Sequence, residues 1–278
     1  MKRNYILLLA LGIIAVVAVT GMIPAALGVS SSIAGNYALA LQLISLFVGF
    51  LLAMRVSNMY NKELKRSFIF LSLFLLFYMI SSPLVLWEYI DKILGSNATI
   101  LLLLALQAVT YAMLITSCIY TVKVIEVRRM KTLGWIVFGI FLAFGVFIVA
   151  KGLIAMGATL SEDAVGAISN VFIRFFDMAI MLMLVPVFVL YVQHMQAKAQ
   201  ESITFTMMWI GLFITILSSY IIELATGLST SDVAAQYFQK GSVLDAVNIF
   251  GYLLIATGLY AHMKYDEWGF RMIEKALG

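Results

Sequence analysis

Three residues capable of polar chemistry share one face of an otherwise apolar segment. Asn170, Arg174 and Asp177 are spaced by four and three residues, so in a helix they lie on the same side. Phe, Ile and Met residues flank the two charges, which places them within the hydrocarbon layer of a membrane. Charges at that depth are costly and usually face a bundle interior or a watery cavity. Two interpretations follow: an ion pair that pins helix packing, or a functional cavity.

A second polar face occurs near the C-terminal end. Asp245, Asn248 and Tyr252 follow one another at i, i+3 and i+7, a spacing that also keeps them on one side of a helix. Glu88 and Glu223 lie near the expected outer ends of two other apolar segments. Together these residues predict a polar, acidic vestibule that opens to the outside and holds a cation or an amine. The alternative for the two glutamates is that they reach the headgroup region and solvent.

Polar partners for the charged pair are also predicted from spacing. Gln107 and Tyr111 are four residues apart and therefore share a helix face. Arg174 and Asp177 are expected to point into the protein, towards each other, towards this face or towards the Asp245 face, because an unpaired charge against lipid costs several kcal/mol.

Signs of enzyme chemistry are few. The chain has two histidines and one cysteine, and it lacks His-Glu-x-x-His, Gly-x-Ser-x-Gly and Walker A motifs. His194 and His262 fall at the ends of their segments, where an interfacial position is expected rather than a haem or metal site. Gly139 and Gly145 indicate close helix packing rather than function. We therefore predict no catalytic residue, no cofactor and no metal, and rank an intramembrane enzyme last.

The composition indicates the environment in which these residues act. Of the 278 residues, 63% are hydrophobic and 12% are charged, and the mean hydropathy is +1.04. A soluble domain is about half apolar and about a quarter charged, so lipid must solvate much of this chain. No linker marks a second domain, and residues 1–278 are predicted to form one transmembrane domain, with 264–278 as a short amphipathic tail.

Membrane-spanning segments follow from hydropathy. A spanning helix needs about 20 apolar residues, and such long continuous runs favour helices over the alternating segments of about ten residues that build barrels. The predicted fold is an all-α, polytopic bundle of eight transmembrane helices. The spans are predicted at residues 5–27, 33–54, 68–89, 100–122, 133–156, 167–192, 203–224 and 243–262.

Lys and Arg residues predict the orientation, because they are enriched in cytoplasmic connections. With both termini in the cytoplasm, only Lys92, Lys151 and Lys240 fall in outer connections. The net charge of +4 is explained by this bias, so no nucleic-acid partner is expected. A cleaved signal peptide at the N-terminus is the alternative for the first span, but its apolar run is longer than a signal h-region. The basic residues assigned to the inner side are Lys2, Arg3, Arg55, Lys62, Lys65, Arg66, Lys123, Arg128, Arg129, Lys131, Lys198, Lys264, Arg271 and Lys275.

The two halves of the chain resemble each other weakly. A shift of 135 residues aligns Glu88 with Glu223 without a gap, and the segment that begins at Tyr111 resembles the one that begins at Tyr252. This pattern favours two parallel four-helix repeats, residues 1–131 and 132–263. Chance similarity between two Leu- and Ile-rich sequences is the alternative.

Three functions from different classes remain. Transport or conduction of a small, cationic solute across the plasma membrane leads, because it uses the intramembrane charges and the repeat. A membrane sensor or assembly subunit, acting through a protein partner or as a homo-oligomer at the cytoplasmic face, comes second. The intramembrane enzyme is third.

Overall fold

The computed structural model describes residues 5–82, 84–125, 130–159, 164–196, 200–228 and 243–264. Within these ranges all regular secondary structure is helical. The helices are α1 (Tyr5–Thr20), α2 (Ile23–Ala26), α3 (Ser31–Ser57), α4 (Lys62–Ser81), α5 (Leu84–Leu94), α6 (Ser96–Ile125), α7 (Thr132–Thr159), α8 (Ala164–Gln196), α9 (Gln200–Leu228) and α11 (Val243–Met263).

Several helices are long and apolar enough to cross a membrane. In the described residues, five stretches meet this condition: Ser32–Ser57, Lys62–Ser81, Ser96–Val124, Thr132–Ile154 and Val243–Met263. Many large apolar side chains on their outer surfaces are exposed, among them Ile140 and Ile154 on α7. Lipid is the solvent that such a surface requires. The chain is therefore a multi-pass helical membrane protein.

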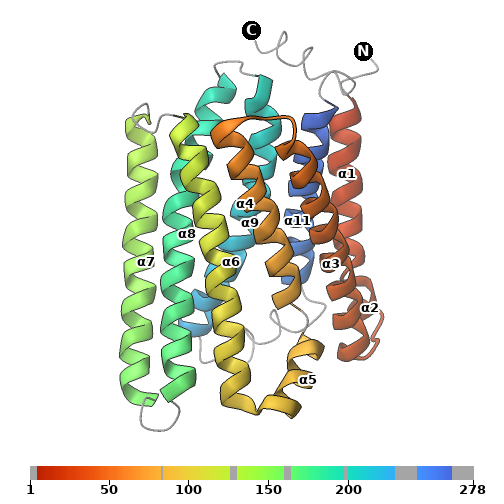
Figure 1. Cartoon of the computed structure of the whole chain (residues 1–278). Helices are drawn as coiled ribbons and strands as arrows, with labels where there is room; N and C mark the ends of the chain where they lie inside the picture. Colours follow the sequence, from red (N-terminus) through yellow and green to blue (C-terminus); the bar gives the residue numbers. More distant parts are fainter. Residues whose placement is uncertain are drawn as a thin grey trace.

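Among the helices that the structure describes, six form a closed ring. Going round it, α8 contacts α6, α6 contacts α4, α4 contacts α3, α3 contacts α11, α11 contacts α9, and α9 contacts α8. Helix α7 packs on α8 and helix α1 packs on α11, so both lie outside the ring. Figure 1 shows α7 and α1 at opposite edges of the bundle. This arrangement gives the protein one interior, to which six helices contribute.

Large apolar side chains fill most of that interior. Trp209 and Phe205 of α9, Leu71 and Leu75 of α4 and Leu114 of α6 are almost completely inaccessible and belong to one cluster of buried residues. Because lipid is as apolar as these side chains, their packing rather than a hydrophobic effect holds the helices together.

Glycine allows α9 and α11 to approach each other closely. A Cβ atom at Gly258 would lie 2.8 Å from the backbone nitrogen of Met208 and 2.8 Å from the carbonyl oxygen of Thr204, and one at Gly211 would lie 2.5 Å from the carbonyl oxygen of Gly251. The expectation for Gly139 is wrong: an added Cβ there would meet nothing within 4 Å. Small residues allow close backbone approach, and here that approach is between α9 and α11.

The predicted third span, residues 68–89, ends too late. Helix α4 stops at Ser81, and residues 84–94 form the separate helix α5, which contacts α6 and lies beyond the end of α4 in Figure 1. Pro83, which has no N–H to donate, falls between the two helices. The indole Nε1 of Trp87 donates to the carbonyl oxygen of Ser81 over 2.9 Å, and Gly95, with a φ of 83°, joins α5 to α6. The apolar run therefore continues through a break in the helix.

The predicted first span is also interrupted. Residues 5–27 were expected to be continuous, but α1 ends at Thr20 and the four-residue α2 begins at Ile23. A Cβ at Gly21 would lie 2.7 Å from Cδ1 of Ile249. The turn therefore packs directly against α11.

Candidate functional site

The ring encloses a set of hydrogen-bonding side chains, here called the interior polar cluster. Every ring helix supplies at least one member. The cluster consists of Gln42 (α3), Tyr78 (α4), Tyr111 (α6), Asp177 (α8), Ser218 (α9) and Asp245, Asn248 and Tyr252 (α11).

Asp177 joins α8 to α6. The hydroxyl of Tyr111 donates to Oδ1 of Asp177 over 2.9 Å, and Asp177 is only 6% exposed. The ring of Phe176, the preceding residue, stacks on Tyr111 with centroids 5.5 Å apart. The contact between Asp177 and Tyr111, one of the partners proposed from the sequence, is confirmed. A buried carboxylate gains its stability from such donors.

Helix α11 bonds to both of its ring neighbours through its polar face. The amide Nε2 of Gln42 donates to Oδ1 of Asp245 over 2.8 Å, which links α11 to α3. One turn further on, the hydroxyl of Ser218 donates to Oδ1 of Asn248 over 2.8 Å, which links α11 to α9. The i, i+3 spacing of Asp245 and Asn248 therefore serves two different partners.

Two tyrosines connect these contacts across the ring. The rings of Tyr78 on α4 and Tyr252 on α11 pack against each other, with centroids 6.0 Å apart. The carboxylate of Asp177 lies within electrostatic range of Tyr78, and that of Asp245 lies within electrostatic range of Tyr252. Both carboxylates therefore lie near the tyrosine pair of α4 and α11.

Arg174 faces a different helix from Asp177. A Cβ at Gly152 of α7 would lie 2.9 Å from Cδ of Arg174, so the arginine side chain packs over that glycine. Residues three apart on a helix differ in direction by about 60°, which is enough for Asp177 to face α6 while Arg174 faces α7. Asn170 lies on α8, and its side chain falls outside the described residues.

The remaining predicted residues are more scattered. Glu88 is exposed on α5, outside the ring. Glu223 lies on α9, with its side chain outside the described part of the chain. The two glutamates were expected at equivalent positions of a repeat, but they lie on unlike elements. Gln107 is half-buried on α6, one turn before Tyr111. The tail at 265–278 also lies outside the described residues.

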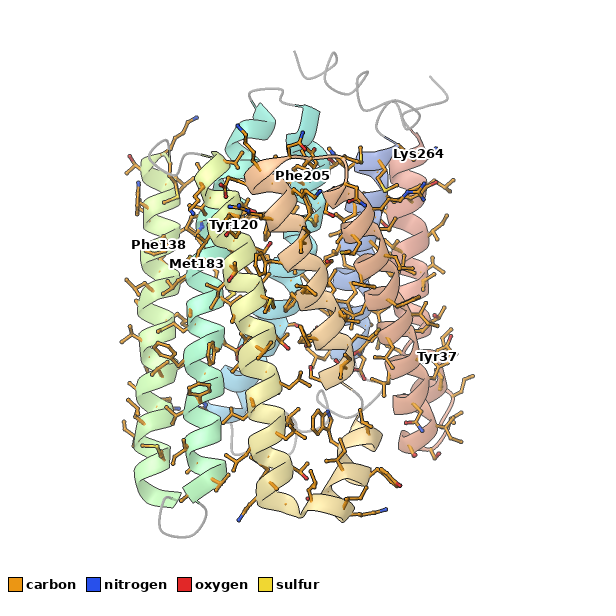
Figure 2. The ribbon with its side chains drawn as sticks, viewed as in Figure 1. Tyr37, Tyr120, Phe138, Met183, Phe205 and Lys264 are labelled. Atoms are coloured by element: carbon orange, nitrogen blue, oxygen red, sulfur yellow. The ribbon has the colours of Figure 1, made fainter. Side chains whose placement is uncertain are left out.

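A second polar site occurs at the other end of the ring, around His262. Tyr60, in the turn between α3 and α4, places its hydroxyl 2.6 Å from Nε2, and the hydroxyl of Thr204 on α9 lies 3.0 Å from Nδ1. The imidazole stacks on Phe205 with centroids 4.5 Å apart. Figure 2 shows Phe205 at the same end of the bundle as Lys264.

His262 is only 9% exposed, so at the end of α11, where an interfacial position was expected, the side chain is buried within the protein. A neutral imidazole has one donor and one acceptor nitrogen, and hydroxyls can take either role. Both nitrogens of the imidazole therefore have a hydrogen-bond partner in either tautomer. The sequence carried no signal for it beyond the aromatic residues around Tyr60 and Phe205, because the contacts join distant segments. The side chain of His194 lies outside the described residues.

Metal and thiol chemistry find little support in the described part of the chain. No group of three or more His, Cys, Asp or Glu side chains there could hold a metal ion. Cys118 is fully buried on α6.

Comparison with known proteins finds no matching family model, no matching curated protein and no matching solved structure. The fold defines a class, the multi-pass helical membrane protein.

Proposed function

We propose that this protein transports or conducts a small cationic solute along the axis of the helix ring. The observation that carries the proposal is that all six ring helices direct polar side chains into one cluster containing two carboxylates. Polar and ionisable groups within membrane segments are costly, face the protein interior and mark ion or substrate pathways.

The chemistry of the cluster suits a cation. Asp177 and Asp245 supply negative charge, and Gln42, Asn248 and the tyrosines supply neutral oxygen atoms. Oxygen ligands of this kind are preferred by hard cations, and they also accept hydrogen bonds from an ammonium group. The side chain of Arg174 lies over Gly152 of α7, so the proposal depends on the two carboxylates.

An aromatic and aliphatic layer separates the interior polar cluster from the His262 site. Phe68 of α4 and Phe205 of α9 meet across the ring with centroids 5.1 Å apart, and Leu71, Trp209 and Leu259 are buried with them. A solute bound at the cluster cannot pass this layer without movement of the helices. The conformation therefore corresponds to a closed state in a gated or alternating-access cycle.

The finer topology belongs to the same proposal: eight spans, with both termini cytoplasmic, in the plasma membrane. The order in which the helices contact one another around the ring supports an internal duplication. Exchanging α3, α4 and α6 for α8, α9 and α11 reproduces each of its six helix contacts. Residues 1–131 and 132–263 would then be related by a two-fold axis along the membrane normal. The two outer helices do not follow the exchange, because α7 packs on α8 whereas α1 packs on α11.

Flux into liposomes tests the function. Purified protein is reconstituted, and uptake of protons, alkali cations and methylammonium is compared with empty liposomes. Asp177→Asn and Asp245→Asn should abolish uptake while the proteins still insert, and Asp91→Asn, at an exposed carboxylate on α5, should retain it. Full uptake by both interior variants would refute the proposed site.

A further inference from the structure

A cationic and aromatic site lies at the seam of α4 and α6, on the outside of the ring. Nζ of Lys123 lies 5.0 Å from the centroid of the Tyr120 ring, and Cζ of Arg66 lies 5.7 Å from the same centroid. The two cations come from different helices and converge on one tyrosine. Phe70 of α4 stacks on that ring at 5.8 Å. Figure 2 shows Tyr120 towards the same end of the bundle as Phe205.

The seam that carries this site is held in a fixed register. The hydroxyl of Ser67, the residue after Arg66, lies 2.7 Å from the hydroxyl of Thr121, the residue after Tyr120. Both groups are buried. Arg66 and Lys123 are therefore presented by rigid backbone, while their own side chains remain exposed.

The surroundings of the tyrosine are those of a lipid-facing surface. Ile119 and Val124, on either side of Tyr120 in the sequence, are 38% and 44% exposed. Tyrosine is enriched at the level of the headgroups, and Lys and Arg side chains extend from apolar surfaces towards that level. A ligand at this site meets two cations and an adjoining apolar wall.

We infer that the Arg66–Tyr120–Lys123 site binds the phosphate headgroup of an anionic phospholipid, whose acyl chain lies along Ile119 and Val124. A phosphodiester accepts charge-assisted hydrogen bonds from both cations, and basic clusters at the membrane surface select anionic lipids. Glu63 holds Arg66 only loosely, at 3.7 Å with the two side chains 38% and 59% exposed, and such exposed pairs contribute little. The phosphate therefore displaces Glu63 from Arg66.

A titration of the full-length protein in neutral detergent tests this site. Dioleoyl-phosphatidylglycerol, dioleoyl-phosphatidylcholine and inorganic phosphate are added separately, and the apparent melting temperature is followed. We expect stabilisation by phosphatidylglycerol alone. In the double variant Arg66→Gln/Lys123→Gln, the apparent affinity for phosphatidylglycerol should fall about tenfold, because each cation lost weakens binding by roughly a few-fold.

The matched control is Lys65→Gln/Lys131→Gln, which removes the same charge from two other exposed lysines and should bind phosphatidylglycerol within about twofold of the wild type. An equal loss in both double variants would overturn the site in favour of general surface charge. Equal stabilisation by phosphatidylcholine would overturn anionic selectivity, and equal stabilisation by inorganic phosphate would overturn the lipid as the ligand.

Discussion

The hydroxyl of Tyr60 and Nε2 of His262 lie 2.6 Å apart, although 202 positions separate the two residues in the sequence. This contact ties the turn between α3 and α4 to the end of α11, and Thr204 adds α9 through Nδ1 of the same imidazole. One side chain therefore joins three parts of the ring at the end opposite the interior polar cluster. The stability of that end depends on the imidazole keeping both partners.

Tyr60→Phe should destabilise the protein. The substitution preserves the ring that stacks on Phe68 and His262 but removes the hydroxyl, which leaves a buried imidazole nitrogen unsatisfied at a cost of about 1–3 kcal/mol. The measurement is the apparent melting temperature in detergent. Tyr89→Phe, at a tyrosine that is 64% exposed, is the control and should change nothing. Equal melting temperatures for the two variants would contradict a structural role for the Tyr60 contact.

Gly258→Ala should weaken the packing of α11 on α9. The new methyl group would lie 2.8 Å from two backbone atoms, which cannot rotate away, so the helices must separate; overpacking of this kind costs about 1–3 kcal/mol. Gly139→Ala is the matched control, because its methyl group meets nothing and alanine favours helix by about 1 kcal/mol over glycine. The two variants should shift the melting temperature in opposite directions, and a shift of the same sign would contradict the prediction.

Hydropathy predicted the apolar helices well where no residue interrupts them. The eighth span was expected at 243–262 and is found as Val243–Met263. The prediction of the third span was wrong because hydropathy averages over residues and does not register a break in a helix, here between Ser81 and Leu84. The turn at Gly21 between α1 and α2 was missed for a similar reason, since it sits within a continuous apolar run.

The polar contacts were predictable only in part. Spacing indicated that Asp177 needed a buried donor, and Tyr111 was among the candidates. Gln42 was not considered as a partner for Asp245, since the pairing depends on α3 lying beside α11, and a single sequence does not contain that adjacency. The burial of His262 was not predictable, because the residues that cover it, Tyr60 and Phe205, come from distant segments.

The orientation of the helices gives a topology prediction. Single cysteines at Lys65 and Lys131, placed in a Cys118→Ala background, should react with a membrane-impermeant maleimide only after the cells are opened, because basic connections stay in the cytoplasm. A cysteine at Lys92 on α5 should react in intact cells. All three lysines are exposed, so protection reports the side of the membrane rather than burial. Labelling of Lys65 and Lys92 from the same side would contradict the eight-span arrangement.

The contact between Tyr111 and Asp177 separates the functional interpretation from the structural one. In a double-mutant cycle, Tyr111→Phe removes the 2.9 Å hydrogen bond and Asp177→Asn removes the charge of its acceptor. Each should lower the melting temperature, and their combination should cost less than the sum, because both changes weaken the same interaction. A hydrogen bond to a charged group contributes about 1.5–3 kcal/mol, which sets the expected coupling. Flux measured on the same proteins then decides the role. If Asp177 binds the solute, Asp177→Asn abolishes uptake whereas Tyr111→Phe, which retains the carboxylate, transports at a reduced rate. If the aspartate is only structural, uptake falls in parallel with the loss of stability in both variants.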